Sequence, residues 1–334
     1  MEKIRVAVIG AGRIGRIHAK NLRSQIPGAQ LLAIADPMVE AARKLAEELE
    51  LPRYEADYRR IMDDREIEAV AICSSTDTHA QIMMEAAAAG KHIFCEKPIA
   101  FDIQTIDRAL AAVERAGVKL MVGFNRRFDP GFKKAKELIR AGRIGRPHLL
   151  RITSRDPQPP PPEYVKGSGG LFLDMTIHDF DMARYLLEEE VMELMAAGNC
   201  LVDPAIGELG DIDTAVVVLK FQSGALGIID NSRRAVYGYD QRIEVFGSEG
   251  VVMVGNRTPA EVTVADAQAV AGEKPLWFFL ERYREAYLAE MEHFVACILE
   301  DETPSVSGFD GKISVQMACA ALESLHKGIF IAVK

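Results

Sequence analysis

A short apolar run that ends in three spaced glycines constrains the fold more than any other feature of the sequence. Residues 4–9 are apolar enough for a buried strand, and Gly10, Gly12 and Gly15 follow at once. A helical pattern of apolar residues then runs from 14 to 22. A strand, a glycine turn and a helix in this order let the backbone approach a pyrophosphate, with the helix N-terminus facing the phosphates. The pattern therefore predicts a dinucleotide-binding βα unit.

A second apolar run, at residues 31–35, ends in an acidic residue. Asp36 follows Gly15 by about 20 residues, the spacing at which a carboxylate of such folds accepts a hydrogen bond from the ribose 2′-hydroxyl. We expect Asp36 to favour NAD over NADP because its charge would repel a 2′-phosphate, although Arg13 is close enough in the turn to soften that preference. The alternative is an ordinary βα turn beside a surface acid.

Strand and helix patterns keep alternating up to about residue 124. Helices are expected at 39–50, 78–89 and 102–116, and strands at 69–73, 92–95 and 119–124. This alternation predicts a doubly wound parallel sheet of the Rossmann type, whose ligand crevice lies at the carboxyl ends of the strands. The expected cofactor contacts are therefore Gly10, Gly12, Arg13, Ile14, Gly15, Asp36, Ser74, Ser75, Thr76, His79, Glu96 and Lys97.

Two of these residues have a simpler interpretation. His79 falls inside a helical pattern, where a histidine on the helix surface is the more ordinary role. Lys97 follows an apolar strand and is fixed by Pro98, but a solvated loop lysine would be the natural interpretation if this strand end stood alone.

The pattern changes after residue 123, which divides the chain into domains at 1–123 and 124–334. A helix at 132–141, a strand at 149–154 and an extended proline-rich loop at 156–162 come first. Strands without intervening helices follow at 192–200, 215–221, 225–231, 242–246, 251–254 and 261–264, and helices at 278–299 and 311–327 end the chain. This order predicts an α+β domain with a large, mostly antiparallel sheet whose open face is an oligomer interface.

The stretch Gly169–Asp181, which precedes the run of strands in the second domain, suggests proton-transfer chemistry. If a helix starts near Asp174, then Asp174, His178, Asp181 and Tyr185 share one narrow stripe. Thr176, Phe180, Ala183 and Leu187 face the opposite side, where they would pack against a core. Asp174 is a better partner for His178 than Asp179, and a carboxylate beside an imidazole suits acid–base chemistry. The alternative is a helix with a solvated face.

Charge and cysteine usage exclude several classes of function. The formal net charge of −9 argues against nucleic acid or an anionic membrane as the main partner. Five scattered cysteines without a Cys-x-x-Cys pair suit reduced thiols in the cytoplasm and give no metal-site spacing. The start of the sequence does not resemble a signal peptide, and no apolar run reaches membrane-spanning length. We expect a cytoplasmic protein without a metal.

The motifs described above resemble those of the Gfo/Idh/MocA family of NAD(P)-dependent oxidoreductases over essentially the whole chain. The resemblance is carried by Gly10–Gly15, by Cys95–Pro98 and by Gly169–Asp181. It implies that Lys97 of the Glu-Lys-Pro motif, Asp174 and His178 are catalytic, and that the Lys97–Pro98 bond is cis. Within the family, Gly123–Asp129, Ser154–Pro157 and Asp230–Arg242 resemble the members that oxidise inositols.

The resemblance implies NAD-dependent oxidation of a secondary alcohol of a cyclic polyol, most simply myo-inositol, by a homo-oligomer, expected to be a tetramer, that forms through the second domain. Many inositol-oxidising members carry histidine and asparagine where this chain has Ser154 and Asp156, which leaves the isomer open. The alternatives are scyllo-inositol or another cyclic polyol or pyranose, and a dinucleotide-binding sensor without catalysis. Arg127, Asp156 and Tyr239 are weaker candidates for substrate contacts, and Arg127 and Tyr239 are equally suited to structural roles.

Overall fold

A computed structural model describes residues 3–333 and divides the chain into two compact units. The first comprises residues 1–128 with 285–315, and the second comprises 129–284 with 316–334. The first crossing lies close to the expected boundary at residue 123. Residues 285–315, which we expected in the second domain, pack with the first unit. The functional division at residue 123 stays a prediction.

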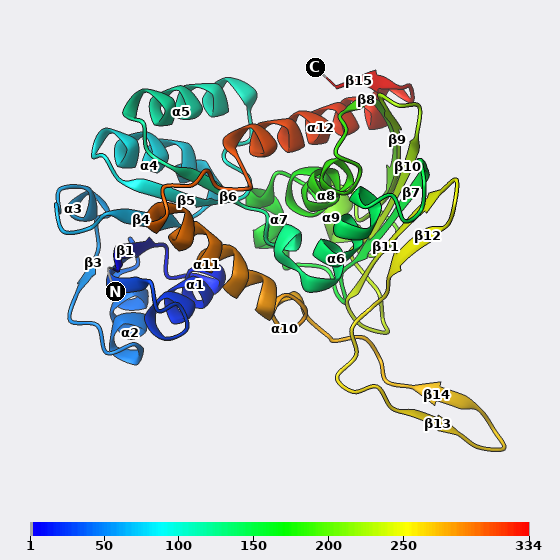
Figure 1. Cartoon of the computed structure of the whole chain (residues 1–334), viewed down its shortest axis with the longest axis horizontal. Coiled ribbons are helices and arrows are strands. Elements are labelled where there is room, and N and C mark those ends of the chain that lie inside the picture. Colours follow the sequence, from blue (N-terminus) through cyan, green and yellow to red (C-terminus); the bar gives the residue numbers. More distant parts are fainter. Residues whose placement is uncertain (1–2, 334) are drawn as a thin grey trace. The chain divides into compact units, whose positions relative to one another are not determined.

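The first unit contains the expected parallel sheet, with strand order β3-β2-β1-β4-β5-β6. Its strands are β1 (Ile4–Ile9), β2 (Ala29–Ala35), β3 (Tyr54–Glu55), β4 (Ala69–Ile72), β5 (His92–Glu96) and β6 (Leu120–Gly123). Its helices are α1 (Arg13–Ser24), α2 (Val39–Glu48), α3 (Arg59–Met62), α4 (Thr76–Ala88) and α5 (Ile103–Ala116). Figure 1 shows α4 and α5 on one side of this sheet and α1 and α2 on the other, the doubly wound arrangement that the alternation predicted.

The second unit is built on a mixed sheet of order β12-β11-β7-β10-β9-β8-β15. Its strands are β7 (Pro147–Arg155), β8 (Val191–Asn199), β9 (Thr214–Phe221), β10 (Leu226–Ser232), β11 (Asp240–Gly247), β12 (Val251–Val254) and β15 (Ile331–Ala332). Only the β7–β10 pair among these is parallel, so the sheet is mostly antiparallel as expected. A separate hairpin of β13 (Thr263–Ala265) and β14 (Val270–Gly272) extends away from it (Figure 1).

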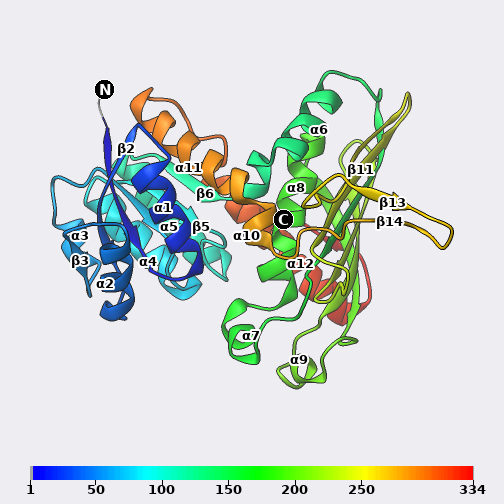
Figure 2. The same cartoon turned by 90° about the horizontal axis from the view of Figure 1, so that it is seen from below.

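Helices cover one face of the second sheet. They include α6 (Pro130–Arg140), α8 (Ile177–Leu187) and the last part of α12 (Gly308–Lys327). The second unit also contains α7 (Pro162–Ser168), α9 (Pro204–Glu208) and α10 (Phe279–Arg282), whereas α11 (Arg284–Leu299) belongs to the first unit. Figure 2 shows α6 and α8 along that face. The sheet also presents exposed apolar side chains, at Val216, Leu226, Phe246, Val251 and Met253, which agrees with an open second face.

Three local expectations need correction. The proline-rich segment does not stay extended to residue 162, because α7 begins there with Pro162 at a position where a missing N–H costs nothing. The expected helix at 278–299 is two helices, interrupted at Tyr283. The short elements α3, α9, β3, β14 and β15 were not expected, since segments of two to five residues carry too little periodic signal.

Candidate active site

The glycine turn after β1 has the geometry of a phosphate cradle. Gly10 has a φ of +105°, and a Cβ there would lie 2.5 Å from the Cys73 carbonyl carbon. A Cβ on Gly15 would lie 1.8 Å from the Gly10 oxygen, so both positions require glycine. Among residues 3–333, by contrast, no heavy atom lies within 4 Å of a Cβ built on Gly12, whose backbone is therefore approachable. This turn fits a dinucleotide pyrophosphate at the N-terminus of α1, which starts at Arg13 and includes Ile14.

Asp36 lies directly after β2 and is held against the same turn. Its Oδ2 accepts a hydrogen bond from the backbone N–H of Ala11 at 2.7 Å, and its Oδ1 accepts one from Met38 at 2.8 Å. These bonds fix the carboxylate beside the glycine turn, where a ribose hydroxyl would be bound. The arrangement agrees with the role expected for Asp36.

The carboxyl end of β4 carries the second group of expected contacts. Ser75 precedes α4 as its N-cap residue, and Thr76 begins the helix. The Ser74 hydroxyl lies 2.7 Å from that of Thr78. His79 is not the surface histidine that we expected, because it is 1% exposed and both ring nitrogens contact backbone carbonyls.

Glu96 and Lys97 follow β5 at the adjacent strand end. The Lys97–Pro98 peptide bond is cis, as the family resemblance implied. Glu96 places its Oε1 2.9 Å from Nε2 of His18, a fully buried residue of α1. The expected contacts at 10–15, 36, 74–76 and 96–97 therefore all belong to the first unit, at the ends of β1, β2, β4 and β5.

The stretch of the second unit that we expected to be catalytic differs from a regular α-helix. Asp174 lies in a π-helix, Phe172–Thr176, and α8 begins only at Ile177. The expected alignment of Asp174 with His178 and Asp181 assumed a regular α-helix, which turns by about 100° per residue. A π-helix turns by a different angle, so the alignment expected for Asp174 was wrong. Single π-turns occur often at functional sites because they shift the side chains that precede a regular helix.

Burial contradicts the alternative of a solvated face. Asp181 is 1% exposed, and the side chains of Thr176, Phe180, Ala183 and Leu187 are buried as expected. Asp179 is also buried, and its Oδ2 accepts a hydrogen bond from Asn231 at 2.8 Å. His178 is intermediate in exposure and therefore reachable in part.

Asp174 has two partners that the sequence did not indicate. Tyr164 donates its hydroxyl to Oδ1 at 2.8 Å, and Arg233 donates Nη1–H to Oδ2 at 2.8 Å. Arg233 is only 2% exposed, and its Nη1 also lies 3.7 Å from Oδ2 of Asp156. Although burial opposes the charge, the carboxylates of Asp174 and Asp156 raise the pKa of Arg233. The structure thus brings two expected site acids to one buried guanidinium.

Arg233 was missed because a single arginine after a strand carries no motif. Its signal was present only in the run of polar residues that ends β10, from Asp230 to Arg234. The parallel pairing of β10 with β7 sets Ser232 beside Arg155, and Asp156 then donates its N–H to the Ser232 carbonyl. Sequence alone does not reveal that pairing.

Arg127 and Tyr239, two of the weaker candidates for substrate contacts, have identifiable partners within their own units, as does Ser154. Arg127 donates to Oδ1 of Asp310 at 2.9 Å within the first unit. Tyr239 is buried and packs edge-on against the ring of Tyr283. Ser154 is fully buried and donates to Oε1 of Gln241 at 3.0 Å.

Comparison with known proteins identifies the family of this chain. Residues 4–124 match the domain described as "Oxidoreductase family, NAD-binding Rossmann fold", and residues 132–253 match the "GFO/IDH/MocA C-terminal domain". The chain therefore belongs to the Gfo/Idh/MocA family of oxidoreductases, and its first unit is an NAD-binding Rossmann domain. The family, the cofactor and the fold class expected from the sequence are confirmed.

Individual relatives match over nearly their full length. The chain is 52% identical to a myo-inositol 2-dehydrogenase of Thermotoga maritima, covering 97% of each chain. It is 38% identical to the scyllo-inositol 2-dehydrogenase (NAD(+)) of Bacillus subtilis, covering 98% of this chain and 95% of the other. The structure of a scyllo-inositol dehydrogenase from Lactobacillus casei, with bound NAD(H) and scyllo-inositol, aligns with a TM-score of 0.94 at 30% identity, covering 99% of each chain.

Two further findings bear on the setting of the protein. In the part of the chain that the structure describes, no helix is long and apolar enough to cross a membrane. All five cysteines are free thiols.

Proposed function

We propose that this protein oxidises a ring secondary alcohol of a cyclic polyol, with myo-inositol as the preferred substrate and NAD as the hydride acceptor. The observation that carries the proposal is the combination of Lys97, Asp174 and His178 in a chain of this family. Relatives named as myo-inositol and scyllo-inositol dehydrogenases support the substrate class. A dinucleotide-binding sensor would need no such proton-transfer set.

The residues of the first unit fit the cofactor. The open backbone at Gly12 and the N-terminus of α1 would hold the pyrophosphate, and Asp36 the adenosine ribose. When bound, the nicotinamide supplies the hydride acceptor. Lys97 stabilises the oxygen that becomes an alkoxide, since a nearby cation lowers the energy of developing negative charge.

The residues of the second unit handle the proton and the ring hydroxyls. His178 accepts the hydroxyl proton as general base, and Asp174 orients the reacting groups. Tyr164 and Arg233 hold both oxygens of Asp174, so that carboxylate is fixed before substrate binds. Asp156, drawn to the same arginine, is the better candidate for a ring hydroxyl than the fully buried Ser154.

Oxidation of scyllo-inositol is the second candidate. Ser154 and Asp156 depart from the histidine and asparagine expected at these positions, so the ring hydroxyls are read by a different set. NADH formation should therefore be measured with myo-inositol, scyllo-inositol and a pyranose, each with NAD and with NADP. We expect the highest kcat/KM for myo-inositol with NAD. The proposal would be contradicted if the enzyme oxidised none of these substrates.

A catalytic role for Lys97 has its own test. Lys97→Ala should lower kcat about 10²–10³-fold while the NADH dissociation constant stays within about threefold, because one electrostatic contact to a developing oxyanion is lost. Lys97→Arg is the matched control that keeps the charge. Near-normal turnover of Lys97→Ala would leave the lysine without a catalytic role.

We also propose a cytoplasmic homotetramer that assembles through the open face of the second sheet. The exposed apolar side chains of β9 to β12 support the interface, and five free thiols suit a reducing compartment. Light scattering on the purified protein tests the assembly. Val216→Lys combined with Met253→Lys should give smaller species, and an unchanged mass would place the interface elsewhere.

A further inference from the structure

The residues on either side of Lys97 are each held by a buried histidine. The side chain of a lysine is a flexible four-carbon stem, so the position of its backbone sets which atoms the ammonium group can reach. Glu96 precedes Lys97 at the end of β5, and Pro98 follows it. Glu96 contacts His18 of α1, and Pro98 contacts His79 of α4.

His18 fixes the Glu96 side chain from within the core. The imidazole is fully buried and packs edge-on against Phe94 and Tyr287, at ring-centroid distances of 4.9 and 5.8 Å. Its Nε2 lies 2.9 Å from Oε1 of Glu96. The other side of that carboxylate is packed closely, since a Cβ on Gly123 would lie 3.0 Å from Oε2. The carboxylate therefore has little freedom to move.

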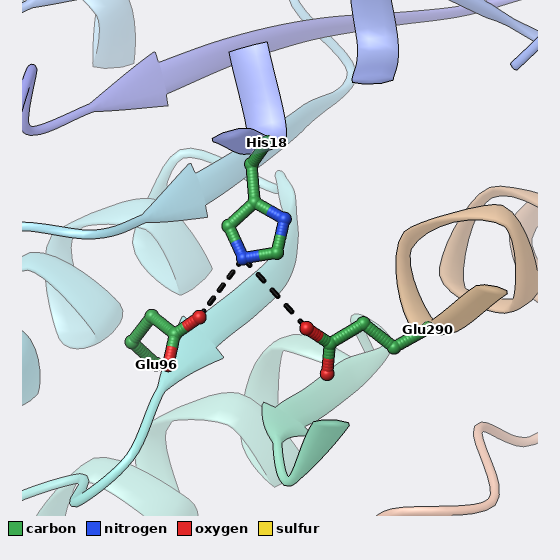
Figure 3. Close-up of side chains that lie close together, drawn as sticks. All are labelled: His18, Glu96 and Glu290. Carbon is green, nitrogen blue, oxygen red and sulfur yellow. Dashed lines mark hydrogen bonds and ion pairs between the residues drawn. The ribbon is translucent and has the colours of Figure 1, made fainter. Parts of the chain in front are cut away.

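Glu290 of α11 completes this cluster, as Figure 3 shows. Its side chain is fully buried, and one oxygen lies 3.8 Å from Nε2 of His18. Among the described residues, neither of its oxygens has a hydrogen-bond partner. Burial, together with the charge of Glu96, raises the pKa of Glu290 well above its usual range, which favours the neutral form of this acid.

The surroundings of His18 argue against a metal ion held by these three side chains. The ligand atoms of His18, Glu96 and Glu290 all lie within 4.8 Å of one another, which is close enough for a shared ion. The 2.9 Å separation of Nε2 and Oε1 is an ordinary hydrogen-bond distance, but it would also suit two ligands of one ion. A metal-bound histidine almost always donates its other ring N–H, but Nδ1 of His18 has no partner in the described part of the chain.

His79 contacts the turn after β5, which contains Lys97, and also the turn after β4. Its Nδ1 lies 2.9 Å from the Pro98 carbonyl oxygen, and its Nε2 lies 3.0 Å from that of Ser74. Because a neutral imidazole has one N–H, the ring donates a hydrogen bond to one of these two carbonyls and only lies close to the other. Helices α1 and α4, which carry the two histidines, also begin at the expected cofactor contacts, Arg13 and Thr76.

We propose that His18, backed by Glu290, and His79 are positioning residues that fix Glu96 and Pro98 and so hold Lys97 in place for catalysis. This inference rests on the proposed role of Lys97. It assigns the histidines no contact with substrate or cofactor. Their effect on the reaction passes through the backbone of one turn.

Amide substitutions test the two contacts separately, because glutamine places its NH₂ near the position of Nε2 and asparagine near that of Nδ1. At position 18 the Glu96 contact uses Nε2, so His18→Gln should keep kcat within about threefold and His18→Asn should lose it. At position 79 the Pro98 contact uses Nδ1, so His79→Asn should do better than His79→Gln. We expect the poorer variant of each pair to lose about 10–100-fold in kcat, since small misplacements of a catalytic group are costly.

The reversal of preference between the two positions distinguishes positioning from general stability. A merely structural role would make losses follow the melting temperature, with the same amide preferred at both positions or with neither preferred. Either result would overturn the inference. If one pair does not fold, the comparison within the other pair still decides.

The Lys97→Ala background separates this inference from the proposed function. If the histidines act through Lys97, His18→Asn should cause little further loss of kcat when Lys97 is already absent. The same loss in both backgrounds would overturn the positioning role while leaving polyol oxidation intact. A crystal structure of His18→Asn gives a readout that needs no activity: the backbone at 96–98 should shift while residues 9–15 stay in place. An unchanged backbone there would also contradict the inference.

Discussion

Each compact unit holds an acid of low exposure beside its site residues, partly buried Asp174 in one and fully buried Glu290 in the other, and the surroundings of these acids differ. In the second unit, Asp174 is paired with the buried guanidinium of Arg233. In the first unit, Glu290 lies beside His18 and another acid, Glu96. A buried carboxyl group either pairs with a cation and stays charged or takes up a proton and becomes neutral. Asp174 of the second unit thus forms an ion pair, whereas burial disfavours a charge on Glu290 of the first unit.

Replacing Arg233, the cation that pairs with Asp174, should have the largest effect on turnover and stability. Arg233→Leu leaves Asp174 partly buried without its partner, and breaking such a pair costs about 3–5 kcal/mol of folding stability. Because Asp174 would also lose its position, kcat should fall by about 10²-fold or more. Arg233→Lys is the matched control that keeps the charge. Steady-state kinetics and urea unfolding measure both effects, and an Arg233→Leu enzyme as active and stable as the control would remove the contrast between the units.

Neutralising the acid of the same pair should be milder. Asp174→Asn keeps the volume and the contact to Tyr164, and Arg233 retains Asp156 as a second carboxylate at 3.7 Å. We expect kcat to fall about tenfold and the melting temperature to fall by less than in Arg233→Leu. A larger loss of stability from Asp174→Asn would mean that the carboxylate, not the guanidinium, is the group that the fold depends on.

Neutralising Glu290 of the first unit should raise the melting temperature at high pH, whereas the changes at Arg233 and Asp174 should lower it. The raised pKa of Glu290 means that its contribution to stability is complete below the unfolded pKa and is lost as the pH rises through the folded value. The ionisable groups that face it are His18, Glu96 and Cys73. Glu290→Gln is neutral at every pH, so it should melt on the order of a few degrees above the wild type at pH 9 and no higher at pH 4. Scanning calorimetry across this range tests the sign, and a lower melting temperature at pH 9 would show that Glu290 is charged.

A cation-paired acid inside the first unit sharpens the comparison with a small effect. Although burial opposes its charge, Arg127 and the Ser307 hydrogen bonds lower the pKa of Asp310 to about 2. Its stabilising contribution is therefore present above the unfolded pKa and is lost as the pH falls through about 2. Arg127→Met should move the acid-unfolding midpoint upward by a few tenths of a pH unit, as followed by circular dichroism. Arg127→Lys is the control, and an unmoved midpoint would assign the low pKa to the Ser307 bonds alone.

The sequence alone predicted five of the six parallel strands of the first unit, but not β3, α3 or the packing of residues 285–315 with this unit. Strand β1 has the expected bounds, and β2, β4, β5 and β6 differ from expectation by one or two residues. Buried parallel strands are continuous apolar runs, and glycine positions such as Gly10 and Gly15 admit no other side chain. These signals are local, so they can be read without knowing the neighbours in space. The same local signals predicted most strands of the second unit in their succession along the chain, but not their order in the sheet.

The tertiary structure alone decided the environment of the site residues. The π-helix at Asp174, the pairing of Arg233 with Asp174 and the burial of His79 each depend on segments far apart in the chain. The cluster of His18, Glu96 and Glu290 joins α1, the end of β5 and α11 across nearly the whole sequence. A sequence shows which side chains can ionise, but charge and orientation follow from desolvation and from partners, which only packing in three dimensions defines.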